Sequence, residues 1–156
     1  MAYSDFTLQE VAQRFQLVIE EQHNLFAAVP DVVPGDFLCA LLDENVPLAL
    51  ALSREQLFIC APMVVIVEAK NENFKAGMGQ CSATMMAAQC FNARADTGLT
   101  TIYGAVTTGN VWKFLQLEEH TLFIDLPEYH IERVGKILGI LLTMVGHHPA
   151  ASAPTV

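Results

Sequence analysis

One acid and one base stand together at the end of an apolar run. Residues 64–67 are all aliphatic, and Glu68, Ala69 and Lys70 follow them in the stretch VVIVEAKNEN. Successive side chains of a β-strand point to opposite faces, so a strand here predicts Glu68 and Lys70 side by side. A carboxylate can bind Mg²⁺, and a nearby lysine can act on an attacking water or on developing phosphate charge. The pair is therefore a candidate for metal-dependent phosphodiester chemistry.

A structural interpretation of the same three residues stands beside the chemical one. An acid and a base two positions apart can form a salt bridge at a strand end, which contributes little to stability. The apolar run before Glu68 and the polar turn after Lys70 favour a strand followed by a turn and a helix, which is the context that the chemistry needs.

The chain resembles an uncharacterised family of bacteria and cyanobacteria within the PD-(D/E)XK nuclease superfamily. The pieces that carry the resemblance are IVEAKNEN, GQC, and TIYGAVTTG with WKF, and it covers most of the chain. It implies a restriction-endonuclease-like fold with a shortened core, and Mg²⁺- or Mn²⁺-dependent hydrolysis of nucleic acid. Glu68 and Lys70 match the motif's acid and lysine, the backbone carbonyl of Ala69 joins the metal coordination, and Gln80 matches a glutamine on the next helix.

The sequence departs from this family at the second metal-binding acid. The family carries an aspartate on the strand before Glu68, but residues 47–52, where that position falls, contain no acid. A hard cation needs several oxygen ligands, so one carboxylate binds Mg²⁺ poorly. The nearest upstream replacements are Asp43, Glu44 and Glu55, of which Asp43 is the candidate metal ligand.

Two alternatives to an active nuclease remain open. The first is a catalytically inactive binding or assembly module that acts as a homo-oligomer, most simply a dimer, because a shortened sheet leaves an edge strand unpaired. A formal net charge of −9 with eight scattered basic residues favours it over strong nucleic-acid binding. The second is an unrelated α/β protein in which Glu68 and Lys70 are only structural.

Length and composition predict one domain over residues 1–146 and a flexible tail over 147–156. The chain has 156 residues and is 53% hydrophobic, but no apolar run reaches the roughly 18 residues of a membrane span. The N-terminus lacks the pattern of a signal peptide, so we expect a cytoplasmic protein. The spacing of the four cysteines fits neither a redox pair nor a zinc site, which predicts buried, apolar cysteines.

The order of the predicted elements indicates an α/β sandwich around a mixed sheet. Thr7 and Glu10 form a capping box, and apolar residues at helical spacing predict one helix over 8–25. The other predicted elements are helices over 34–45, 74–92 and 128–145, and strands over 57–69, 99–107, 111–117 and 121–126.

The remaining polar residues allow two interpretations. Residues 107–110 predict a hairpin turn whose hydroxyls either contact phosphate or only shape the turn. Trp112 and Lys113 beside it either touch a nucleic-acid chain or form an aromatic cross-strand pair and a solvated lysine.

Overall fold

A computed structural model describes residues 7–31, 65–68 and 74–146 of the chain. The predicted helix over 34–45, most of the predicted strand over 57–69, and the tail lie outside the described residues. In chain order the elements are α1 (Leu8–Phe15), β1 (Val18–Gln22), β2 (Val65–Glu68), α3 (Phe74–Arg94), β3 (Thr101–Thr107), β4 (Val111–Glu118), β5 (Thr121–Asp125), β6 (Tyr129–His130), a 3₁₀ turn (Ile131–Arg133) and α4 (Val134–Gly146).

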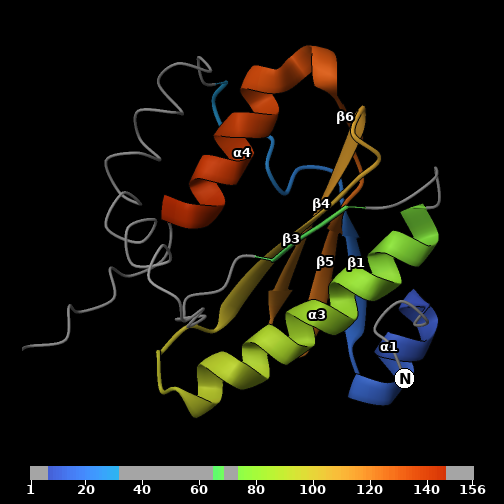
Figure 1. Cartoon of the computed structure of the whole chain (residues 1–156), viewed down its shortest axis with the longest axis vertical. Helices are drawn as coiled ribbons and strands as arrows, with labels where there is room; N and C mark the ends of the chain where they lie inside the picture. The colour runs from blue at the N-terminus through green and yellow to red at the C-terminus, as the bar shows by residue number, and fades with distance from the viewer. Residues whose placement is uncertain (1–6, 32–64, 69–73, 147–156) are drawn as a thin grey trace, which may run out of the picture.

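The strands form one mixed sheet in the order β1-β5-β4-β3-β2, with β6 pairing beside β4 (Figure 1). The pairs β1/β5 and β2/β3 are parallel, whereas β4 is antiparallel to both β3 and β5. Strands β1, β2, β3 and β5 therefore run in one direction and end at the same edge of the sheet. The predicted α/β class, with a mixed sheet flanked by helices, is confirmed.

Helices α1 and α3 cover one face of the sheet. Strand β3 has a glycine at position 104, where a Cβ atom would lie 2.5 Å from the Met85 sulfur and 2.7 Å from the Cys81 sulfur. Only a glycine therefore lets these side chains of α3 rest directly on the strand. The buried core of this face consists of Val11, Leu17, Cys81, Ala83, Met85, Met86, Ala88, Ile102, Val106, Leu115, Leu117, Leu122 and Ile124.

Helix α4 and the segment after β1 cover the opposite face. Phe114 lies at the centre of an aromatic cluster there, with ring centroids 5.8 Å from Phe26, 5.4 Å from Tyr129 and 6.2 Å from Trp112. The buried residues of this face are Phe26, Ala105, Phe114, Tyr129, Ile137, Ile140 and Met144.

The predicted N-terminal helix over 8–25 is wrong beyond its second turn. The capping box is present, with the Glu10 amide donating to Thr7 Oγ1 at 3.3 Å, but the helix ends at Phe15. Gln16 takes a left-handed conformation with φ 54°, and Val18–Gln22 then pairs with β5. Val18 and Ile19 are β-branched residues that suit a strand, so pairing with a distant segment overrides the helical spacing.

The last helix also begins later than predicted. Residues 129–130 form β6 and residues 131–133 a 3₁₀ turn, so α4 starts at Val134 rather than near Glu128. The predicted helix over 74–92 is confirmed and extends to Arg94, and the three predicted strands from 99 to 126 are confirmed within two residues of their ends. Among the described residues, no helix is long and apolar enough to cross a membrane.

Replacing Gly139 by alanine is expected to destabilise the protein, because its Cβ atom would overlap the carbonyl oxygen of Pro30. Alanine by itself favours a helix by roughly 1 kcal/mol over glycine. Overpacking against backbone costs about 1–3 kcal/mol, so we expect a net loss. Urea denaturation measures it, and a variant as stable as the wild type would show that the segment around Pro30 does not rest on α4.

Candidate functional site

Glu68 lies where the sequence places it, at the C-terminal end of a strand that is followed by a helix. It is the last residue of β2, and its register partner is Thr107, the last residue of β3. Helix α3 connects these two parallel strands. In sheets with parallel strands, ligands bind at the carboxyl ends of the strands. The position of Glu68 in the fold is thus one where a ligand can be reached.

Gln80 is the other predicted site residue in the described part of the chain. It is half-buried on α3, and α3 packs against β2. Its backbone carbonyl accepts a hydrogen bond from Thr84 Oγ1 at 3.0 Å. Asp43, Ala69 and Lys70 lie outside the described residues, as do Glu44 and Glu55.

Among the described elements, those that pack beside β2 supply no second carboxylate. Its main neighbours in the described part are α3 and β3, and neither FKAGMGQCSATMMAAQCFNAR nor TIYGAVT contains an acid. Within ranges 7–31, 65–68 and 74–146, no three histidine, cysteine, aspartate or glutamate residues lie close enough to hold a metal ion. Any further ligand beside Glu68 must therefore come from other segments or from a second molecule.

A buried acid that the sequence reasoning missed lies at the end of β5. The Asp125 side chain has no exposed surface, and its Oδ2 accepts a hydrogen bond from the Tyr129 hydroxyl at 2.7 Å. Its Oδ1 has no hydrogen-bond partner among the described residues. Burial raises the pKa of this carboxyl, while the Tyr129 hydroxyl, the backbone of Leu25 and the charges of Lys113 and Lys136 act in the opposite direction. Burial, and then Asp125 itself, raise the pKa of Tyr129.

Asp125 is too far from β2 to replace the second acid of the motif. Three strand spacings separate β2 from β5 in the sheet order, and at about 4.8 Å each this is about 14 Å. Two carboxylates that share one Mg²⁺ each bind it at about 2.1 Å. The acid at the end of TLFID, with a tyrosine four residues later, was the only sequence signal for this buried pair.

Two lysines beside Asp125 bind backbone carbonyls. Lys136, which is buried, donates from Nζ to the Ala27 carbonyl at 3.0 Å and also to the Val29 carbonyl. Lys113 donates from Nζ to the Leu126 carbonyl at 3.0 Å. Lys113 is half-buried, so the prediction of a solvated lysine is wrong, and its ammonium group helps to hold the chain after β5.

The hairpin between β3 and β4 uses its own hydroxyls. Thr107 Oγ1 donates to the Val111 carbonyl at 2.9 Å and accepts from the Gly109 amide at 2.8 Å. The Val111 amide donates to Thr108 Oγ1 at 3.4 Å. These bonds favour the plain turn over a phosphate contact. Trp112 stacks on Phe114, but both residues lie on β4, so this aromatic pair is within one strand and is not the predicted cross-strand pair.

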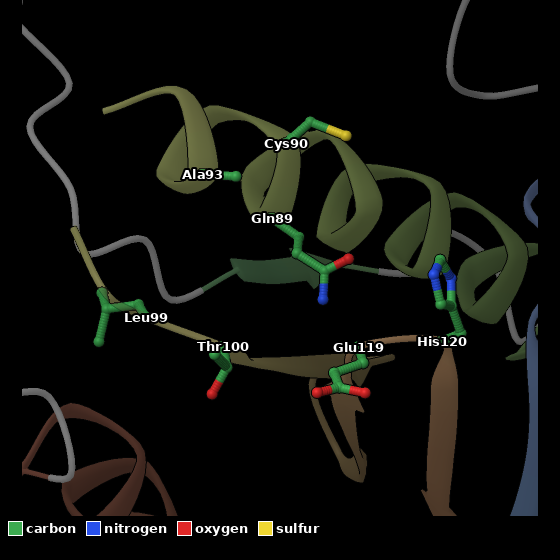
Figure 2. Close-up of a pocket in the computed structure, with 7 residues that line it drawn as sticks. All are labelled: Gln89, Cys90, Ala93, Leu99, Thr100, Glu119 and His120. Carbon is green, nitrogen blue, oxygen red and sulfur yellow. The ribbon is translucent and has the colours of Figure 1, made fainter. Parts of the chain in front are cut away.

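Two shallow hollows lie at the opposite end of the sheet from Glu68. One, of about 380 Å³, is lined by Gln89, Cys90, Ala93, Leu99, Thr100, Glu119 and His120 (Figure 2). The other, of about 430 Å³, shares Thr100 and Glu119 with it and is otherwise lined by Thr101, Glu118, Thr121 and Phe123. No sequence pattern indicates either hollow, because the lining residues come from α3, the start of β3 and the β4–β5 turn.

Comparisons with protein-family models, with curated proteins and with solved structures each found no match to this chain.

Proposed function

We propose that this chain is a nuclease-like protein of the PD-(D/E)XK superfamily, with a restriction-endonuclease-like fold in a cytoplasmic protein. The observation that supports it is the unit β2–α3–β3, which puts Glu68 at the carboxyl end of a strand level with Thr107. The motif requires its acid at the end of an apolar strand, because only there can the carboxylate reach a metal ion and the substrate.

In this proposal each residue of the motif has its own task. Glu68 and the backbone carbonyl of Ala69 bind Mg²⁺ or Mn²⁺, which supplies Lewis-acid activation of water and stabilises charge on the phosphate. Lys70 orients the attacking water or binds the phosphate oxygen, and Gln80 supports the site from α3. Asp43 is the proposed source of the second carboxylate, and the substrate is a nucleic-acid phosphodiester.

Cleavage assays on plasmid DNA, single-stranded DNA and RNA with Mg²⁺ or Mn²⁺ test the proposal. Glu68→Gln and Lys70→Met should each lower the cleavage rate by more than the roughly 10–100-fold that loss of an outer-shell partner causes. Glu128→Gln is the matched control, because Glu128 is exposed and far along the chain from the motif. Cleavage that survives Glu68→Gln, or no cleavage with either metal, would contradict the proposal.

A second candidate function is a catalytically inactive binding or assembly module that forms a homo-oligomer. Two observations favour it: α3 and β3 contain no acid, and the chain has a net charge of −9. It predicts a stable oligomer in sedimentation and a melting temperature that Mg²⁺ and Mn²⁺ leave unchanged. A metal-induced rise in melting temperature that Glu68→Ala abolishes would reject it in favour of the nuclease.

A further inference from the structure

Strand β1 forms one edge of the sheet in the described part of the chain. It pairs with β5 on one side only, and Figure 1 shows it as the last strand beyond β5. The first four of its five residues are exposed. Natural edge strands are usually shielded by proline, lysine, a bulge or a covering segment, since an open edge is a template for another strand.

The backbone groups available at this edge belong to Ile19 and Glu21. The Val18 amide donates to the His120 carbonyl, and the Gln22 carbonyl accepts from the Leu126 amide, both at 2.8 Å. Backbone groups of successive residues alternate in direction along a strand, and in a parallel pair each residue presents its amide and carbonyl to the same side. Val18, Glu20 and Gln22 therefore bond toward β5, and the amides and carbonyls of Ile19 and Glu21 point outward.

The side chains at this edge are apolar and acidic. Val18 is 56% exposed and Ile19 37%, which makes them two of the four large exposed hydrophobic residues in the described ranges. Glu20 and Glu21 beside them are also exposed. The sequence contains no lysine or arginine between Arg14 and Arg54, or between Lys113 and Arg133, so neither β1 nor β5 contributes a positive charge.

This charge pattern disfavours a second copy of the chain at the same edge. An antiparallel pair of β1 strands that meet through their outward groups can centre on Ile19, Glu20 or Glu21. The last two centres place a glutamate opposite its own copy, and every centre brings the glutamates of both strands together with no lysine or arginine from either. Like charges directly opposite each other in a sheet are destabilising. A partner strand with lysine or arginine among β-branched residues instead places opposite charges next to the glutamates, which is stabilising. Its apolar side chains also cover Val18 and Ile19.

We propose that β1 binds an extended, basic segment of a partner protein, which adds a strand to the sheet next to Ile19 and Glu21. Backbone hydrogen bonds supply the affinity and the two glutamates supply the selectivity, as in other cases of strand addition. The proposal does not depend on nuclease activity.

The test uses the full chain and an eight-residue peptide of valine and threonine with two adjacent lysines at its centre, because adjacent strand residues face opposite sides of the sheet, as Glu20 and Glu21 do. Its counterpart carries glutamate in place of each lysine. We expect binding of the basic peptide only, weakening as salt screens the charges. Glu20→Lys/Glu21→Lys should weaken binding at least tenfold. Glu128→Lys/Glu132→Lys, which changes the net charge equally at other exposed positions, should leave it within twofold.

Backbone variants separate strand addition from simple charge attraction. Ile19→Pro removes an outward amide without removing a bond to β5, so the variant should stay folded and lose peptide binding. In the unaltered chain, amide exchange followed by NMR should slow at Ile19 and Glu21 when the peptide is added. Binding that survives Ile19→Pro, an equal loss in the Glu128/Glu132 control, or amides already protected without peptide would overturn the proposal. So would a lack of binding at millimolar peptide.

Discussion

Replacing Phe114 by alanine is expected to lower the free energy of unfolding by about 3–5 kcal/mol. The ring is fully buried on β4 and contacts Phe26, Trp112 and Tyr129. Its removal takes away buried apolar surface and leaves a cavity, because the sheet and α4 cannot close completely around it. Urea denaturation followed by circular dichroism measures the loss.

Phe91→Ala is the matched control for this effect. Phe91 lies on α3 with 42% of its surface exposed, so the same change in chemistry should cost less than about 1 kcal/mol. If both variants lose the same free energy, the aromatic cluster under α4 is not the centre of a core.

Replacing Tyr129 by phenylalanine is expected to cost about 1–3 kcal/mol at neutral pH, because the buried Asp125 carboxylate loses its hydroxyl donor. The hydrogen bond favours the ionised carboxylate and lowers a pKa that burial raises. The variant therefore raises the pKa of Asp125 further. The loss should be largest at pH values above the carboxyl's pKa in the folded variant and should shrink as the pH falls through it.

A double-mutant cycle with Asp125→Asn isolates this interaction. In the Asp125→Asn background Tyr129→Phe removes a bond to a neutral amide, so its cost in unfolding free energy there should not depend on pH. With Asp125 present, the cost should fall as the carboxylate becomes protonated. The coupling free energy between the two positions should therefore fall toward low pH. Urea denaturation of all four proteins at several pH values provides the measurement. A coupling that does not change with pH would mean that Asp125 keeps one protonation state over the whole range, which would contradict the expected titration.

The C-terminal half of the fold was predictable because its signals are local. Residues 74–94 combine alanine, methionine and glutamine without proline, and the strands from 101 to 125 are separated by short polar turns. The N-terminal half was harder. Val18 and Ile19 continue the helical spacing from Leu8, and only their pairing with β5, about a hundred residues later, decides for a strand.

The candidate site was predictable in part, for a similar reason. An acid after an apolar run identifies a strand end, and Glu68 lies at one. The burial of Asp125 could not be read in the same way. The burial of Asp125 depends on α4 and on the segment around Ala27. These two segments are far apart in the sequence and are joined in the fold by the hydrogen bond from Lys136 to the Ala27 carbonyl.

The parallel pairing of β1 with β5 has a consequence for the order in which the chain folds. Val18 pairs with Thr121, and Lys136 binds a carbonyl 109 residues earlier in the sequence. Contacts over such separations close large loops and form slowly. During synthesis β1 therefore cannot pair with β5 until Thr121–Asp125 has left the ribosome, whereas α3, β3 and β4 can assemble before that.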